Sequence, residues 1–176
     1  LLIHYKPSLW VASLPIVVVL QYAVSCVYHW LPQNARLQKV DHLMIVILIG
    51  VTIVPYWGTL LPVTEMLWRL PVLAALTAST VIIRWFWFSW RKVGRGLYLT
   101  LGSFGLLVSF NELPLWLTPL PLAVFWLSIA LYVAQFVVYT RELPNPIPGV
   151  FGFREIQHLI LLAATMSQTV VSLKYL

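Results

Sequence analysis

Residues 41–61 read DHLMIVILIGVTIVPYWGTLL, and beyond the Asp-His pair at their start they contain no charged side chain. A run of about 20 apolar residues is long enough to cross the hydrocarbon core of a bilayer as an α-helix. The stretch at 96–110 is the weakest of the predicted spans, because it is short and contains two glycines. The sequence predicts an all-α, polytopic transmembrane bundle in a single domain of residues 1–176, with helices at about 9–30, 41–61, 66–87, 96–110, 119–139 and 153–173.

The composition indicates that lipid is the main solvent of this chain. Hydrophobic residues make up 61% of the sequence and charged residues only 9%, whereas a soluble domain carries roughly 25% charged residues. The net charge of +6 does not predict a nucleic-acid partner, because the basic residues lie in short loops between apolar spans. The single cysteine, Cys26, excludes an internal disulfide and a cysteine-rich metal site.

Lysine and arginine predict the orientation of the spans. Cytoplasmic loops of membrane proteins are enriched in these residues, so the more basic side should be cytoplasmic, at the plasma (inner) membrane. A chain that begins at Leu1 with its N-terminus outside is also expected to lack one earlier span. The basic residues on the predicted cytoplasmic side are Arg36, Lys39, Arg91, Lys92, Arg95, Arg141 and Arg154, and those on the opposite side are Lys6, Arg69 and Lys174.

Polar residues gather at the predicted cytoplasmic ends of three spans. Ser25 and His29 are four residues apart, which places them on one helix face. Asp41 and His42 open the second span. The last span opens with Arg154 and His158, again four apart. Because imidazole and carboxylate are zinc ligands, and a catalytic zinc takes three protein ligands and a water, the pattern is compatible with a shared metal site.

Each of these polar residues also has a purely structural interpretation. His29 beside Trp30 is typical of an interfacial anchor, and Asp41 at the start of a helix is typical of an N-cap. Charged residues within spans cost roughly 2.5–3.5 kcal/mol each, so long side chains there are expected to snorkel. The remaining structural expectations are an interfacial His42, a snorkelling Arg84, a dipole role for Glu155, solvated loop positions for His4, Glu65 and Glu112, and interhelical hydrogen bonds for Gln135 and Gln168.

Four segments resemble one known family. Ser25-Cys-Val-Tyr-His29 resembles the Ser-x3-His of the hemolysin III family, within the superfamily of the progestin and adiponectin receptors. Asp41-His42 and the apolar run to Pro55 resemble that family's Asp-His-…-Pro helix. Residues 98–102, Tyr-Leu-Thr-Leu-Gly, and residues 144–158, PNPIPGVFGFREIQH, resemble two further motifs of the family, and all four keep their order along the chain.

This resemblance implies a seven-helix fold, of which the six predicted spans would be the second to the seventh. It also implies a zinc ion near the cytoplasmic face, held by three histidines, and ceramidase-type hydrolysis of a lipid amide. Carried over to this chain, His29 and His158 are zinc-ligand candidates. Ser25 and Asp41 are the catalytic candidates that would attend the bound water, and membrane lipids are the expected substrates or ligands.

Arg154 is the departure from the family pattern, because it stands where the family has the first His of His-x3-His. A guanidinium group stays protonated and offers no lone pair to a metal. Either Asp41 becomes a third zinc ligand beside His29 and His158, or the site is metal-free and Arg154 replaces the metal's charge by pairing with Asp41. We favour the second alternative.

Three functions remain open from the sequence. The first is a zinc-dependent lipid amide hydrolase, or a degenerate descendant of one. The second is a non-enzymatic lipid sensor, receptor-like or membrane-homeostasis protein that uses the same helical framework. The third is a cytolysin or pore, which is less favoured because the polar residues are expected at one end of the spans. The sequence does not indicate an oligomeric state.

Overall fold

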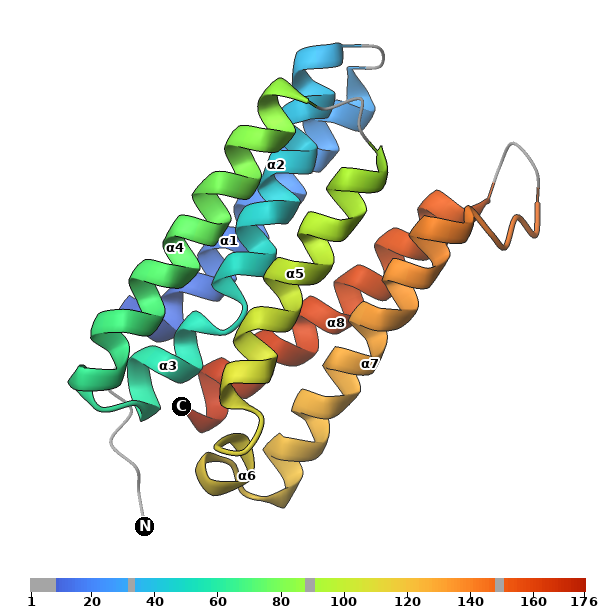
Figure 1. Ribbon diagram of the computed structural model, residues 1–176. Helices are drawn as coiled ribbons and strands as arrows, with labels where there is room; N and C mark the ends of the chain where they lie inside the picture. The colour runs from blue at the N-terminus through green and yellow to red at the C-terminus, as the bar shows by residue number, and fades with distance from the viewer. Residues whose placement is uncertain (1–8, 32–33, 88–90, 148–150) are drawn as a thin grey trace. The chain divides into compact units, whose positions relative to one another are not determined.

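The computed structural model describes residues 9–31, 34–87, 91–147 and 151–176, which fold almost entirely into helices (Figure 1). His4 and Lys6 therefore lie outside the described residues. The helical fold class predicted from the sequence is confirmed. The helices of the described chain are α1 (Leu9–Trp30), α2 (Ala35–Val51), α3 (Val54–Leu60), α4 (Val63–Phe86), α5 (Arg91–Ser109), α6 (Leu113–Trp116), α7 (Pro119–Arg141) and α8 (Phe153–Tyr175).

Most of the predicted spans are long and apolar enough to cross a membrane. By length and composition, the described residues contain five such segments, formed by α1, by α2 and α3 together, and by α4, α7 and α8. The weakest predicted span corresponds to Val93–Ser109 in α5, which is apolar but shorter. The chain is therefore a helical membrane bundle, with α5 as its least hydrophobic member.

Helix α2 begins earlier than the predicted start at Asp41. The side-chain oxygen of Asn34 accepts hydrogen bonds from the backbone N–H groups of Arg36 (2.9 Å) and Leu37 (3.2 Å), which is how an N-cap residue satisfies the first turn. Asp41 consequently lies inside the helix. Its interpretation as the N-cap is wrong, because Asn34 has that role.

The second span is interrupted between α2 and α3. Pro55 has no N–H for the carbonyl of Val51, and its ring would clash with that carbonyl in a continuous helix. The Thr52 hydroxyl donates a hydrogen bond to the Leu48 carbonyl (2.8 Å) at the break, and the same carbonyl also accepts the Thr52 backbone N–H (3.1 Å). The predicted span 41–61 is thus two helices in series.

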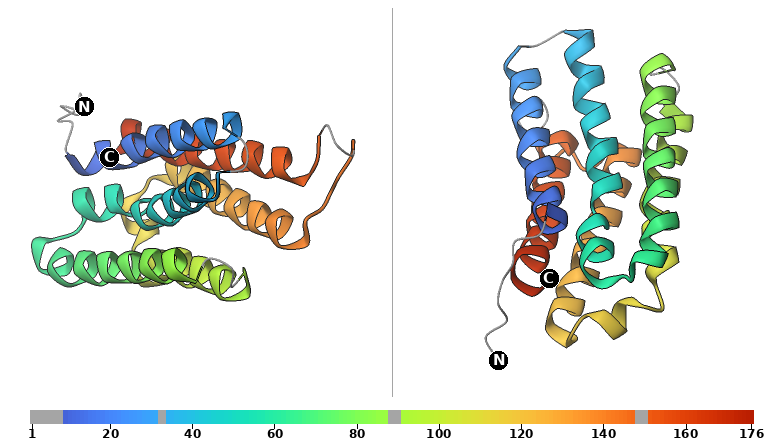
Figure 2. Two further views of the ribbon diagram at one scale, coloured as in Figure 1. Left: turned by 90° about the horizontal axis from the view of Figure 1, so that it is seen from above. Right: turned by 90° about the vertical axis from the view of Figure 1, so that its left-hand side faces the viewer.

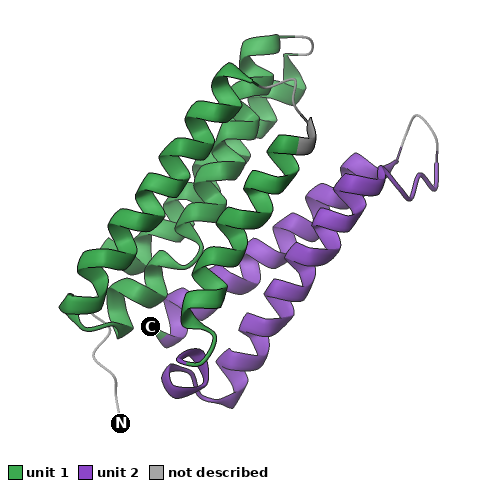
Figure 3. Cartoon of the chain, viewed as in Figure 1, with its two compact units in different colours: residues 1–111, 176 green, residues 112–175 purple. Residues whose placement is uncertain are grey.

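The chain forms two compact units, residues 1–111 with 176 and residues 112–175 (Figure 3). In unit 1, α2 lies between α1 and α4 (Figure 2), and α5 packs against both α2 and α4. In unit 2, α7 packs against α8 along its length and also contacts α6. The single domain predicted from the sequence stays a prediction.

Small residues allow the helices of unit 1 to approach closely. A Cβ atom added at Gly50 in α2 would collide with the side chain of Thr77 in α4. A Cβ atom added at Gly105 in α5 would lie 3.0 Å from Cγ2 of Ile53. Close backbone approach is a main source of helix association where lipid removes the hydrophobic force between helices.

Unit 2 is joined by polar groups in the middle of its helices. Gln168 in α8 is fully buried, and its Nε2 donates a hydrogen bond to Oγ of Ser128 in α7 (2.5 Å). The interhelical hydrogen bond predicted for Gln168 is therefore confirmed. Thr165 and Ser172, also buried in α8, donate their hydroxyl protons to carbonyls of their own helix. Each of these polar side chains therefore has a hydrogen-bond partner within unit 2.

The glycine contacts of α5 generate a stability prediction. Gly105→Leu should destabilise the protein by about 1–3 kcal/mol, because the larger side chain cannot fit against Ile53 without moving α5. Gly96→Leu is the matched control, since a Cβ there has no atom within 4 Å and leucine is the better helix former. Thermal unfolding in mild detergent should show a lower midpoint for the first variant only. Equal midpoints would contradict the described packing.

Candidate functional site

Asp41 is a carboxylate buried in unit 1, with 4% of the residue exposed. Its Oδ1 accepts a hydrogen bond from Nε2 of Gln21 in α1 (3.4 Å). Gln21 is itself 2% exposed, and its Oε1 has no hydrogen-bond partner among the described residues. Gln21 is not among the site residues predicted from the sequence, although a signal for it exists, because it lies one helical turn before Ser25 on the buried face of α1.

The His42 side chain contacts the preceding turn of α2, and its predicted interfacial position stays a prediction. Its Nδ1 lies 2.9 Å from the Gln38 carbonyl oxygen and 3.9 Å from Oδ2 of Asp41. The ring is part-buried. It also lies within electrostatic range of Arg84 in α4, which therefore belongs to the same region of unit 1.

Arg84 does not snorkel to water, because it is 4% exposed. Its guanidinium carbon lies 5.7 Å from the centre of the Tyr98 ring in α5. A Cβ atom at Gly94 would come within 2.6 Å of Nη1 of Arg84, so the missing side chain leaves room for the guanidinium group between α4 and α5. We refer to Gln21, Asp41, His42 and Arg84 as the Asp41 cluster.

The two candidate residues of α1 differ in exposure. Ser25 is buried at 6% exposure, on the same stripe as Gln21. His29 is exposed near the end of the helix, and its ring centre lies 5.0 Å from that of Tyr28. Exposure next to Trp30 agrees with the interfacial interpretation of His29. The ligand interpretation stays a prediction.

The start of α8 is fixed by the motif that precedes it. Oδ1 of Asn145 accepts a hydrogen bond from the backbone N–H of Phe153 (3.0 Å), and Oε2 of Glu155 accepts one from that of Gly152 (2.7 Å). The second bond is the glutamate half of a capping box. A Cβ atom at Gly152 would lie 2.7 Å from Oδ1 of Asn145. The motif therefore sets the position of the first turn of α8.

That first turn carries the remaining two site candidates. Arg154 is exposed, and its guanidinium carbon lies 5.8 Å from the ring centre of Phe153. His158, one turn later, is part-buried. Ser25, His29 and Asp41 belong to unit 1, whereas Arg154 and His158 belong to unit 2. Since each unit is described by itself, the convergence of the five residues stays a prediction.

The donor set does not match a three-histidine zinc site. In the part of the chain that the structure describes, neither unit by itself groups three His, Cys, Asp or Glu side chains around a metal position. Arg154 occupies the place where the resemblance requires a ligand histidine, and a guanidinium group has no lone pair to donate. His29 and His158 are the only imidazoles left for the predicted positions.

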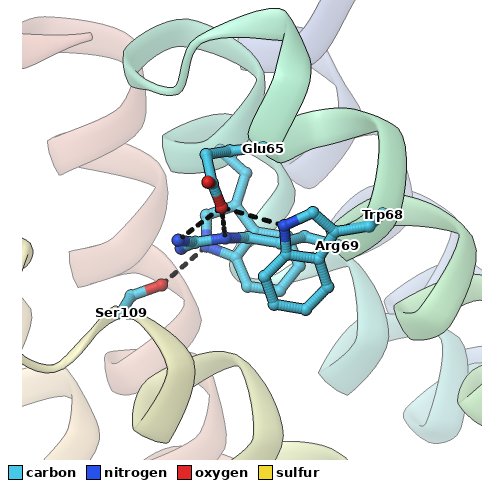
Figure 4. Close-up of polar contacts among 5 residues, drawn as sticks. Glu65, Trp68, Arg69 and Ser109 are labelled. Carbon is cyan, nitrogen blue, oxygen red and sulfur yellow. Dashed lines mark hydrogen bonds and ion pairs between the residues drawn. The ribbon is translucent and has the colours of Figure 1, made fainter.

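A second polar cluster lies at the other end of α4 (Figure 4). Oε2 of Glu65 accepts hydrogen bonds from Nε of Arg69 (3.1 Å) and from the Trp68 indole (2.9 Å), and it lies 3.0 Å from Nη2 of Arg69. The Trp57 indole donates to Ser109 (2.6 Å), and Arg69 lies over the Trp57 ring at 5.9 Å. We refer to Trp57, Glu65, Trp68, Arg69 and Ser109 as the Arg69 cluster.

The Arg69 cluster corrects two expectations from the sequence. Glu65 is not a solvated loop residue, because it lies in the first turn of α4 and pairs with Arg69, which is 5% exposed. Buried polar groups are also not confined to one end of the spans. Arg69 and Arg84 are about four turns apart on α4, or ~22 Å of helical rise.

The Gln21–Asp41 contact can be tested by a double-mutant cycle. Gln21→Leu and Asp41→Asn should together show a coupling free energy of about 1 kcal/mol or less, since the hydrogen bond is long. Thr100→Val is the control partner for Asp41→Asn, because Thr100 is exposed and bonds its own helix at Gly96. Unfolding in detergent supplies the free energies. If the coupling free energy with Gln21→Leu is no larger than that with Thr100→Val, the Gln21 and Asp41 side chains act independently.

Comparison with known proteins supplies one match. A family model described as Haemolysin-III related matches residues 4–169. The match includes every candidate site residue named above. No curated protein and no solved structure matched the chain.

Proposed function

The chain belongs to the hemolysin III family, and on that premise we propose that it carries a degenerate, metal-free descendant of a zinc-dependent lipid amide hydrolase site. Family membership and the five apolar spans make the chain an integral membrane protein. In this proposal the site recognises a membrane lipid and does not hydrolyse it. Arg154 replaces the positive charge of the metal and pairs with Asp41.

The burial of Asp41 and the length of its polar contacts are the observations that carry the proposal. Among the described residues of unit 1, Asp41 has a long hydrogen bond from a neutral amide and a histidine nitrogen at 3.9 Å. A carboxylate that is only 4% exposed is costly unless a cation or several donors compensate it. Arg84 of the same cluster packs against the Tyr98 ring at 5.7 Å, and we expect a further positively charged group to pair with Asp41 and complete this site.

Arg154 is suited to supply that charge. Its guanidinium group presents five N–H donors in a planar fork that matches a carboxylate. It is held at a defined position in α8, because Asn145 and Glu155 fix the first turn of that helix. It would also repel a dication bound one turn away at His158. In the metal-free site, Ser25, His29 and His158 are the further polar groups that a lipid could contact.

The competing functions require features that are harder to find in this chain. A hydrolase would need three protein ligands on the metal and an open position for water, and Arg154 removes one ligand. A pore would need a wet polar path along its helices, but the buried hydroxyl groups of Thr165 and Ser172 bond to their own helix. Lipid recognition requires neither feature.

We place the site toward the cytoplasmic face of the plasma membrane. The support is the distribution of charge, since the loops on the Asp41 side of the spans carry most of the Lys and Arg residues. A ligand would then reach the site from the lipid, from the cytoplasm, or from both.

Metal analysis tests the proposal. The natural chain, purified in mild detergent and supplied with zinc, should retain almost none. Arg154→His should retain about one zinc per chain, because it restores the third imidazole of the family site. Adding His158→Ala to that variant should abolish the gain in bound zinc. Elemental analysis by mass spectrometry gives the ratio of zinc to protein.

Arg141→His is the matched control, since Arg141 is an exposed arginine at the end of α7. It should leave the zinc content unchanged. Stoichiometric zinc in the natural chain, lost in His158→Ala, would refute the metal-free site. A parallel assay for release of fatty acid from a long-chain N-acyl lipid should be negative for the natural chain.

A further inference from the structure

The side-chain amide of Gln21 has an open hydrogen-bond acceptor beside Asp41. Gln21 is 2% exposed and lies on the buried face of α1, where the buried residues before it, Leu14 and Val18, are apolar. Its Nε2 donates a hydrogen bond to Oδ1 of Asp41 (3.4 Å), whereas its Oε1 is buried and has no hydrogen-bond partner among the described residues. Within unit 1, the amide is therefore used on its donor side only.

A structural role does not explain this amide. A buried acceptor without a partner lowers the stability of the fold, because it has given up its hydrogen bonds to water. Leucine at position 21 would continue the apolar face of Leu14 and Val18 without that cost. Gln168 in α8 is buried as fully, but it bonds to Ser128 and leaves no such acceptor open. The open acceptor of Gln21 therefore points to a ligand group.

The surroundings of Oε1 define the group that it can accept. An amide oxygen binds only a hydrogen-bond donor, and the Asp41 carboxylate on the other side of the amide repels a phosphate group. In the proposed site an arginine meets the charge of Asp41, so the donor on the ligand is expected to be neutral. Because Oε1 is covered by protein atoms, the donor also has to be small.

A hydroxyl group meets these conditions, since it donates a hydrogen bond, is uncharged and has a single heavy atom. The N–H of a secondary amide meets the first two conditions only, because substituents flank it on both sides. We propose that Gln21 accepts a hydrogen bond from a free hydroxyl group of the bound lipid and selects lipids that carry one. This inference rests on the proposed function, because it requires a lipid at the Asp41 site.

Selectivity is the property that Gln21 is expected to control. A site that pairs with a hydroxyl group rejects the analogue without it, because the buried polar group of the protein then stays unpartnered. A residue that only packs between α1 and α2 would change stability without changing the ratio in which two such lipids bind. The ratio therefore separates ligand recognition from packing.

Competition between two lipids tests the inference on the full chain in mild detergent. A diacylglycerol, which has a free hydroxyl group, and its methyl ether with identical acyl chains are added in equal amounts, and native mass spectrometry counts each bound lipid by its mass. The natural chain should retain about fivefold more of the diacylglycerol, as expected for one hydrogen bond to a neutral acceptor. Gln21→Leu and Gln21→Met should bring this ratio to about one, because both remove the acceptor and keep a side chain of similar size.

Gln135→Leu is the matched control, since Gln135 is a half-buried glutamine of α7 in unit 2. It should keep the preference of the natural chain. If Gln21→Leu does not fold, Gln21→Met supplies the same comparison, and the thermal unfolding midpoint identifies the folded variants.

Equal retention of the two lipids by the natural chain, or an unchanged preference in the Gln21 variants, would overturn the inference and leave lipid recognition by the site intact. Retention of neither lipid would also overturn it. The metal-free site is judged separately by its zinc content, which does not enter the ratio of the two lipids.

Discussion

Hydrocarbon offers no hydrogen bonds, so each polar group within the spans must find its partner inside the protein. The α7–α8 pair satisfies this condition through the Gln168–Ser128 bond and through hydroxyl groups that bond to their own helix. At the break between α2 and α3, the Thr52 hydroxyl serves the same purpose. The positions of these polar groups follow from this one requirement. A buried polar group without such a partner needs another group to complete it.

The two ends of α4 show the contrast. Glu65 receives donors from Arg69 and Trp68 and needs nothing more. Asp41 is more deeply buried, and its donors among the described residues of unit 1 lie at 3.4 Å (Gln21) and 3.9 Å (His42), while Oε1 of Gln21 has no hydrogen-bond partner among those residues. The Glu65 carboxylate is thus held by short hydrogen bonds within the Arg69 cluster, whereas the described contacts of Asp41 are longer.

The sequence predicts the helices well because apolar runs of membrane length are a strong signal. It also contains the i, i+4 spacing of Glu65 and Arg69, which could have identified their ion pair. The start of α2 was misplaced because an exposed Asn34 cap is a local feature outside the apolar run. Gln21 could have been found from its position one turn before Ser25, whereas the surroundings of Arg84 depend on the register between helices, which hydropathy does not determine.

The interruption at Pro55 has a mechanical consequence for the second span. A continuous helix transmits rotation and tilt along its whole length, whereas a break before a proline allows the two halves to bend relative to each other. Asp41 lies on α2, and Trp57 of the Arg69 cluster lies on α3. A tilt of the α2 half can therefore be absorbed at Thr52 and Ile53 while the Arg69 cluster stays in place.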